Sequence, residues 1–222
     1  MQTFGIEKYT MTYPILYNDY LQFGADHPKN KQINIATLAG GTAAFENGLN
    51  RFLNYTHFNN EIWYLGAEWD RKLFQSLLKK APENMTPVFN EIHKAIDEYH
   101  NDYGFKFDSI FLDYCQSPEW DVVNSLVKLL RSSRLRKKAL VYVTFYMSPR
   151  VGLAAEYASE IKKRMHTTDW KKAFVRYLRT RTPKDWELYL EWPYLSGARN
   201  LAPMLLLGFV RGVHLPTGRK LV

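Results

Sequence analysis

Short apolar segments alternate with longer segments of helical periodicity from Lys31 onward, and this alternation leaves few folds open to the chain. Short apolar runs are typical of buried strands, whereas apolar residues spaced by three and four are typical of helices that cover a sheet. The expected strands are residues 33–38, 61–67, 86–89, 107–112 and 139–146. The expected helices between them are residues 42–53, 70–80, 91–100 and 120–130. Strands that alternate with helices form βαβ units, so we expect a parallel sheet.

The carboxyl-terminal third has a different pattern. Residues 153–165 and 169–179 have helical periodicity, and two apolar segments, residues 186–192 and 204–213, then follow without a helix between them. Strands connected in this way pair antiparallel. We therefore expect an α/β fold with a Rossmann-like, mostly parallel seven-stranded sheet, helices on both faces and a C-terminal antiparallel hairpin.

The length of 222 residues and the hydrophobic content of 46% suffice for one sizeable core. Residues 1–30 have no clean periodicity, and we expect them to form an N-terminal extension that packs on the core. Residues 31–222 are then a single domain. The only cysteine, Cys115, excludes an internal disulfide and favours a reducing compartment. No apolar stretch is long enough to cross a membrane and no secretory signal is evident, so we expect a cytoplasmic protein.

The net charge of +8 is distributed unevenly along the chain. Residues 1–122 carry a net charge of −6, whereas residues 123–222 carry +14. A basic surface of this kind most commonly meets nucleic acid, although it can also serve solubility alone. The residues predicted to contact nucleic acid are Arg134, Arg136, Lys137, Lys138, Lys171, Lys172 and Arg176.

Aromatic residues are interleaved with the second of these basic runs. Such rings can stack on unpaired bases. However, Trp170, Phe174 and Tyr177 are spaced by four and three, which places them on one side of a helix. We therefore predict that these three rings belong to the core and that the basic side chains remain on the surface.

Three landmarks fall where predicted parallel strands end. The first strand runs into the turn Leu38-Ala39-Gly40-Gly41, the second ends at Glu68, and the fourth ends at Asp113. Ligands of doubly wound sheets bind at the carboxyl ends of the strands. The order of these landmarks, with the terminal hairpin, resembles the class I S-adenosylmethionine-dependent methyltransferases.

The resemblance implies a cofactor, S-adenosylmethionine, and a set of residues that bind it. Glu68 corresponds to the acidic residue that holds the ribose hydroxyls, and Asp113 to the fourth motif of the family. Trp69 is a candidate to cover the adenine ring, and Asn90 to bind its edge. The full set of expected cofactor-binding residues is Thr37, Leu38, Ala39, Gly40, Gly41, Glu68, Trp69, Asn90 and Asp113.

The sequence departs from the family at two motifs. The first turn lacks the usual carboxylate and the G-x-G step. In the fourth motif, Asp113, Tyr114 and Cys115 are the catalytic candidates, and Cys115-Gln116 resembles the nucleophile motif of cytosine C5 enzymes without its preceding proline. A thiolate there would attack a base ring. The alternative for Cys115 is a small buried side chain.

Together these features predict an S-adenosylmethionine-dependent methyltransferase that acts on nucleic acid. The alternative is a catalytically inactive protein of the same fold that serves as a nucleic-acid-binding or assembly module. A nicotinamide-dependent oxidoreductase is disfavoured, because the sequence has no G-x-G-x-x-G and ends in a hairpin. The six histidines form no pair at metal-ligand spacing, so we expect no metal site.

Overall fold

The computed structural model describes residues 12–28, 31–56, 58–114, 117–147, 170–196, 202–213 and 215. The strands are β1 (Ile33–Leu38), β2 (Ile62–Ala67), β3 (Met85–Val88), β4 (Phe107–Asp113), β5 (Leu135–Tyr146), β6 (Glu187–Ser196) and β7 (Ala202–Arg211). The helices are α1 (Tyr13–Ala25), α2 (Ala44–Tyr55), α3 (Arg71–Lys80), α4 (Ile92–Tyr103), α5 (Trp120–Leu130) and α7 (Trp170–Arg181), with a short 3-10 turn, η2 (Gly40–Thr42).

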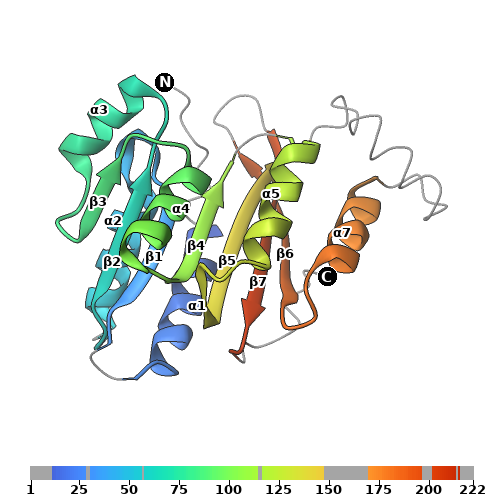
Figure 1. Ribbon diagram of the computed structural model, residues 1–222, viewed down its shortest axis with the longest axis horizontal. Helices are drawn as coiled ribbons and strands as arrows, with labels where there is room; N and C mark the ends of the chain where they lie inside the picture. The colour runs from blue at the N-terminus through green and yellow to red at the C-terminus, as the bar shows by residue number, and fades with distance from the viewer. Residues whose placement is uncertain are drawn as a thin grey trace.

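These strands form one seven-stranded sheet in the order β3-β2-β1-β4-β5-β7-β6 (Figure 1). The first five strands are parallel, and β7 runs antiparallel between β5 and β6. The predicted fold class is therefore confirmed. We call the side where β1, β2, β4 and β5 end the carboxyl edge and the side where they begin the amino edge.

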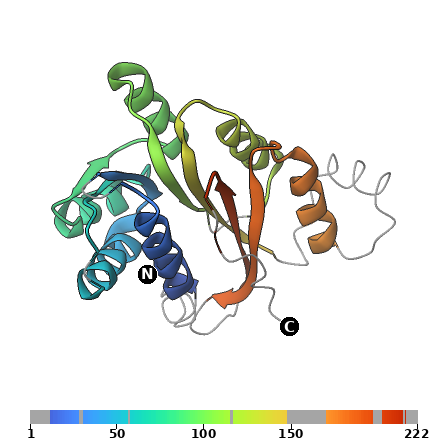
Figure 2. The same ribbon diagram turned by 90° about the horizontal axis from the view of Figure 1, so that it is seen from below.

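Helices cover both faces of the sheet (Figure 2). On one face, Tyr20 of α1 and Leu49 of α2 are fully buried in a common apolar cluster. On the other face, Ile96 of α4, Leu126 of α5 and Phe174 of α7 are fully buried in a second cluster. The prediction that Phe174 and Tyr177 belong to the core is confirmed, since both are buried.

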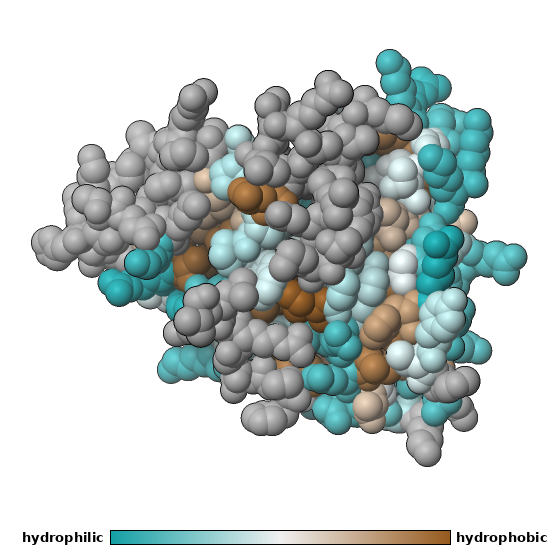
Figure 3. Space-filling model, turned by 180° about the vertical axis from the view of Figure 1, so that it is seen from behind, coloured by the Kyte–Doolittle hydropathy of each residue, from teal (hydrophilic) through white to brown (hydrophobic). Residues whose placement is uncertain are grey.

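The face covered by α1 and α2 is seen from behind in Figure 3. Hydrophobic residues show there as small patches between hydrophilic ones. No described helix is long and apolar enough to cross a membrane. The helix expected at residues 153–165 lies outside the described residues.

Helix α1 lies in the segment for which the sequence pattern predicts no regular element. Its buried residues include Tyr13, Leu16, Tyr17, Tyr20 and Phe23, which recur at intervals of three and four. The helical pattern is present, but three of these five residues are tyrosines. Hydropathy scales rank tyrosine as polar because of its hydroxyl group, so the pattern of apolar residues is not evident from hydropathy. The tyrosine rings pack against the sheet as part of its core.

Strand β5 begins four residues earlier than the expected strand, at Leu135 rather than Ala139. Phe107 of β4 pairs with Leu135, whereas Ser109 pairs with Leu140. Residues 136–139 therefore bulge out of the ladder opposite one residue of β4. The three basic residues at 136–138, expected in the tail of the preceding helix, lie instead in this bulge at the amino edge.

Candidate functional site

Strand β1 ends at the carboxyl edge in the turn that is predicted to bind the cofactor. Thr37 and Leu38 are the last residues of the strand, and Ala39 leads into η2. Gly40 has a φ of +57°, and a Cβ added there would meet no atom within 4 Å. The backbone of Gly40 therefore borders open space and can adopt a left-handed conformation without strain.

Gly41 has a different role from Gly40. A Cβ at Gly41 would lie 3.1 Å from Leu73 Cδ2 and 3.3 Å from the Leu73 carbonyl oxygen. This glycine therefore lets α3 pack closely against the turn. Ala43 follows with a φ of +46°, an uncommon conformation for alanine that costs on the order of 1 kcal/mol. Helix α3 therefore holds the turn in place, and the surrounding structure keeps Ala43 in its strained conformation.

Glu68 follows the last residue of β2 and is 7% exposed. Its Oε1 accepts a hydrogen bond of 2.8 Å from the Asp70 amide. Asp70 in turn caps α3 by accepting bonds from the Lys72 and Leu73 amides. Burial raises the pKa of Glu68 above the ordinary value of a glutamate. The last residues of the two strands, Leu38 of β1 and Ala67 of β2, pair with each other. The buried carboxylate of Glu68 therefore follows β2 beside the Gly40 turn that follows β1.

The two residues predicted to contact adenine are placed near this strand end. Trp69 is 69% exposed, so its ring is not part of the core. Asn90 is half-buried, and its side-chain amide donates to both carboxylate oxygens of Glu98. Its Oδ1 accepts from the Glu91 amide, so the Asn90 side chain already takes part in internal bonds.

Asp113 is half-buried at the end of β4. Its Oδ1 accepts a hydrogen bond of 2.6 Å from Thr144 Oγ1 of β5. The neighbouring strand therefore fixes the orientation of this carboxylate. Because β1 lies between β2 and β4, Asp113 and Glu68 lie on either side of the Gly40 turn.

Glu46, on the first turn of α2, is a candidate residue that the sequence reading missed. It is 1% exposed, and neither carboxylate oxygen has a hydrogen-bond partner in the described part of the chain. Burial raises the pKa of Glu46 to about 7, and the nearby charge of Asp113 adds to this rise. The Thr37 hydroxyl and the backbone amide of Glu46, which lie near the carboxyl group, offset part of this rise in the pKa. Thr37 Oγ1 is itself buried without a partner.

Tyr114 points to the opposite face of the sheet from Asp113. Its hydroxyl lies 2.6 Å from His93 Nε2 of α4, and its ring stacks on Phe145. Burial raises the pKa of Tyr114 and lowers the pKa of His93. Both groups are therefore neutral at neutral pH. Cys115 lies outside the described residues.

The predicted nucleic-acid-binding residues occupy three places. Arg134 pairs with Asp97 of α4. The bulge residues Arg136, Lys137 and Lys138 line a cleft at the amino edge. On α7, the side chains of Lys172 and Arg176 are exposed, whereas that of Lys171 lies outside the described part. The first basic run is thus divided between two surfaces.

The described residues contain no group of three or more His, Cys, Asp or Glu side chains that could hold a metal ion.

Comparison with known proteins gives similarity in structure only. No protein-family model matches the sequence, and the comparison with curated proteins gave no match. The Methanococcus jannaschii fibrillarin pre-rRNA processing protein is 13% identical over 85% of this chain and 70% of its own, with a TM-score of 0.51. A fibrillarin/Nop5p complex gives 14% identity over 91% of this chain and 80% of the matched chain, with a TM-score of 0.51. A putative methyltransferase from Escherichia coli gives 16% identity over 95% and 90%, with a TM-score of 0.49.

At these identities the likeness concerns the fold. The fold of this chain is that of the class I S-adenosylmethionine-dependent methyltransferases, in a divergent sequence. The seven-stranded order with its antiparallel β7 agrees with the resemblance drawn from the strand-end landmarks.

Proposed function

We propose that this protein is an S-adenosylmethionine-dependent methyltransferase that acts on nucleic acid and binds its cofactor at the carboxyl edge. One observation carries the proposal. The open Gly40 turn lies between two strand-end carboxylates, Glu68 and Asp113, and the helix that follows the turn carries Glu46, whose buried carboxyl group has no hydrogen-bond partner among the described residues. Buried polar groups in proteins are normally hydrogen-bonded, and a bound ligand would supply the partner that the described residues do not.

The donor set at this edge fits the cofactor. Glu68 has carboxylate oxygens suited to accept hydrogen bonds from a ribose diol, as the resemblance implies. S-Adenosylmethionine carries a sulfonium and an ammonium group, and Asp113 and Glu46 offer negative charge to such cations. Trp69 offers an exposed ring close to Glu68 for an adenine face.

The bound cofactor would supply an electrophilic methyl group on its sulfonium sulfur. The residues of this chain then have binding and orienting roles. Thr144 fixes the Asp113 carboxylate by its 2.6 Å hydrogen bond, so that the acceptor atom of the substrate meets a carboxylate of defined orientation. α3, packed on Gly41, keeps the turn in one conformation.

The charge of residues 123–222 supports nucleic acid as the substrate class. RNA is the first nucleic acid to test, because one structure of the same fold is described as a pre-rRNA processing protein. Lys172 and Arg176 lie exposed on α7 and are the candidates for phosphate contacts beside the methyl-transfer site.

Calorimetric titration with S-adenosylmethionine and S-adenosylhomocysteine tests the proposal. We expect Glu68→Ala to weaken cofactor binding by roughly 1–3 kcal/mol, about 5- to 150-fold, because ligand hydroxyls lose a buried acceptor. The matched control is Glu61→Ala, an exposed glutamate just before the other end of the same strand, which should leave the affinity unchanged. Absence of binding by the wild type at millimolar cofactor would overturn the proposal.

The inactive alternative also has an observation in its favour. The Glu68 and Asp113 carboxylates already accept bonds from Asp70 and Thr144, and the first turn lacks its usual carboxylate. Failure of the titration, together with retained nucleic-acid binding, would favour this second function.

A further inference from the structure

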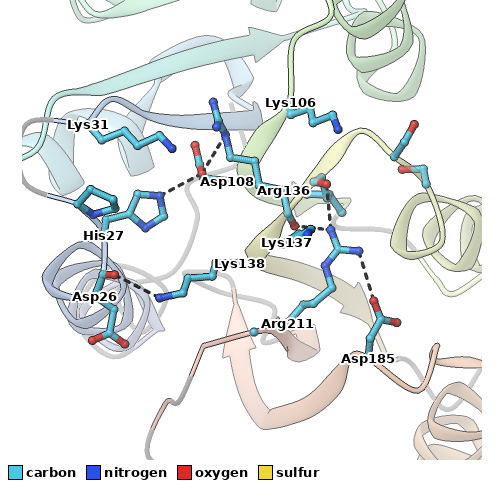
Figure 4. A pocket seen from close by; sticks show the side chains of 15 residues that line it. Asp26, His27, Lys31, Lys106, Asp108, Arg136, Lys137, Lys138, Asp185 and Arg211 are labelled. Carbon is cyan, nitrogen blue, oxygen red and sulfur yellow. Dashed lines mark hydrogen bonds and ion pairs between the residues drawn. The ribbon is translucent and has the colours of Figure 1, made fainter.

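A cleft with a volume of about 1050 Å³ opens at the amino edge, remote from the strand ends described above (Figure 4). Its walls come from the segment after α1, the starts of β4 and β5, and the end of β7. It contains six cationic side chains, Lys31, Lys106, Arg136, Lys137, Lys138 and Arg211. Three carboxylates, Asp26, Asp108 and Asp185, also line it, so its net charge is +3 with His27 neutral.

Asp108 organises the wall of the cleft from within the protein. It is fully buried, and its Oδ2 accepts a hydrogen bond of 2.9 Å from the Asn34 amide. Its Oδ1 lies 3.2 Å from His27 Nε2 and 3.2 Å from Arg136 Nε. The negative charge of Asp108 is thus paired with groups inside the protein. One of these groups is Arg136, which Asp108 holds at the start of the β5 bulge.

The bulge itself is held in a defined position. Gly212 has a φ of +62°, and a Cβ added there would lie 2.7 Å from the Lys137 carbonyl oxygen. Arg211 donates to the carbonyl oxygens of Leu135 and Arg136 and lies over the ring of Trp186, 4.7 Å from its centroid. These contacts hold the backbone that carries the consecutive basic residues at the start of β5.

The four lysines of the cleft are not paired with a carboxylate among the described residues, so their positive charge is available to a ligand. The side chains of Lys31, Lys106 and Lys137 are exposed, and each lacks an ion pair or hydrogen bond with the described residues. Among the described residues, Lys138 Nζ forms its one hydrogen bond with the Asp26 backbone carbonyl, at 3.4 Å. Four ammonium groups around one cleft without a carboxylate partner repel one another, and a bound anion relieves this repulsion.

The lining of the cleft indicates which anion it takes. Most residues that line the cleft are charged or polar, and no aromatic ring that could stack on a base is among the exposed lining residues. Sites for small molecules usually have only a few polar groups, whereas charged side chains predominate among the residues that line this cleft. Flexible lysines act as point charges for phosphates without reading sequence.

We propose that this cleft binds the phosphodiester backbone of nucleic acid at the edge opposite to the methyl-transfer site. The proposal rests on nucleic acid as the substrate class and does not require methyl transfer. β4 connects the two edges, and its seven residues span roughly 20 Å. A nucleic acid that contacts both edges must therefore extend over several nucleotides.

The test compares two triple variants that remove the same charge. In the cleft variant, Lys31, Lys106 and Lys137 are replaced by glutamine. In the control variant, three exposed lysines of α3, Lys72, Lys79 and Lys80, are replaced by glutamine. None of these six lysine side chains forms an ion pair or hydrogen bond with the described residues, so both variants should fold as the wild type does. Fluorescence polarisation with labelled RNA and DNA of about 20 nucleotides, at a series of KCl concentrations, measures the affinity.

We expect the cleft variant to lose about tenfold or more in affinity at low salt and the control to lose much less. The slope of log affinity against log salt should become shallower by about 2 for single strands and about 3 for duplex, if each lysine neutralises one phosphate. An equal loss in both variants, or displacement of the nucleic acid by polyglutamate of matched charge, would overturn the proposal. Calorimetry with S-adenosylmethionine should give the wild-type affinity for the cleft variant, so failure of the cofactor site and failure of the cleft are distinguishable.

Discussion

Two buried acidic groups, one at each edge of the sheet, differ in whether the surrounding residues bind them. At the amino edge, Asp108 is fully buried and contacts a histidine, a backbone amide and an arginine. At the carboxyl edge, Glu46 is almost as deeply buried and has no hydrogen-bond partner among the described residues. Both carboxyl groups were removed from water during folding, but among the described residues only the first has partners that compensate it.

This difference shows how a carboxyl group can serve structure or function. A paired buried charge orients the groups around it, and its removal leaves those groups buried without a partner. An unpaired buried carboxyl group instead raises its pKa and lowers stability when it ionises. The amino edge thus uses an acid to assemble a basic cleft, whereas the carboxyl edge holds an acid without a hydrogen-bond partner in the part of the chain that the structure describes.

The largest effect is expected from breaking the Asp108 network. Asp108→Asn should lower the free energy of unfolding by about 3–5 kcal/mol, because Arg136 and the Asn34 amide lose a buried anionic acceptor. Urea-induced unfolding followed by circular dichroism measures this change. Asp185→Asn is the control, since Asp185 pairs with Arg211 in the same cleft but its side chain is 61% exposed. The control should change stability by less than about 1 kcal/mol. Equal losses in the two variants would mean that Asp108 does not organise the edge.

Glu46→Gln tests the opposite edge through pH. The pKa of Glu46 is raised from its ordinary 4.5 to about 7 in the folded protein, so the folded state holds this proton more tightly than the unfolded state. The wild type should therefore lose stability as pH rises from about 4.5 to 7, by about 3 kcal/mol from this group alone. The groups that share its surroundings, Asp113, Tyr20 and Tyr64, remain in the variant. The variant should lack this loss and be the more stable protein above pH 7.

Unfolding curves of both proteins between pH 4.5 and 8 measure this difference. The stability difference should be small at the acidic end and should grow toward neutral pH. Saturating S-adenosylmethionine should reduce the advantage of the variant, if a cofactor cation compensates the Glu46 charge. Parallel curves across the whole range would contradict a raised pKa and remove the contrast with Asp108.

Much of the fold was predictable because parallel strands buried on both faces are nearly continuous apolar runs. The segments at residues 33–38 and 107–112 agree with β1 and β4 to within a residue. The start of β5 was not predictable in this way, because residues 136–138 are basic and belong to a bulge that tertiary pairing creates. α1 was missed because its apolar face consists largely of tyrosines.

The candidate site was predictable only where it follows directly from strand ends. The positions of Glu68 and Asp113 depend on chain order, which the sequence contains. Glu46 was missed because the helix was predicted from its apolar residues, such as Phe45 and Leu49. Glu46 lies three residues before Leu49 and therefore on the same face of the helix, but it was not considered because it is charged. The amino-edge cleft joins residues as distant as Lys31 and Arg211, and only the folded chain brings them together.

The smallest effect is expected at Tyr114. This residue lies at the carboxyl edge, but its hydroxyl group has a hydrogen-bond partner within the protein, as the Asp108 carboxylate does. Its hydroxyl lies 2.6 Å from His93 Nε2, and burial keeps both groups neutral by raising the pKa of Tyr114 and lowering the pKa of His93. Tyr114→Phe keeps the ring on Phe145 and should cost about 1 kcal/mol of stability. If this hydroxyl only positions the strand end, methyl transfer in a single turnover should change by less than about fivefold, the equivalent of that energy. Tyr103→Phe, at a tyrosine that is 73% exposed, is the matched control and should change neither quantity. A loss of more than about a hundredfold in turnover with intact cofactor binding would place Tyr114 among the groups that touch the substrate, and would show that a satisfied residue at this edge can still be catalytic.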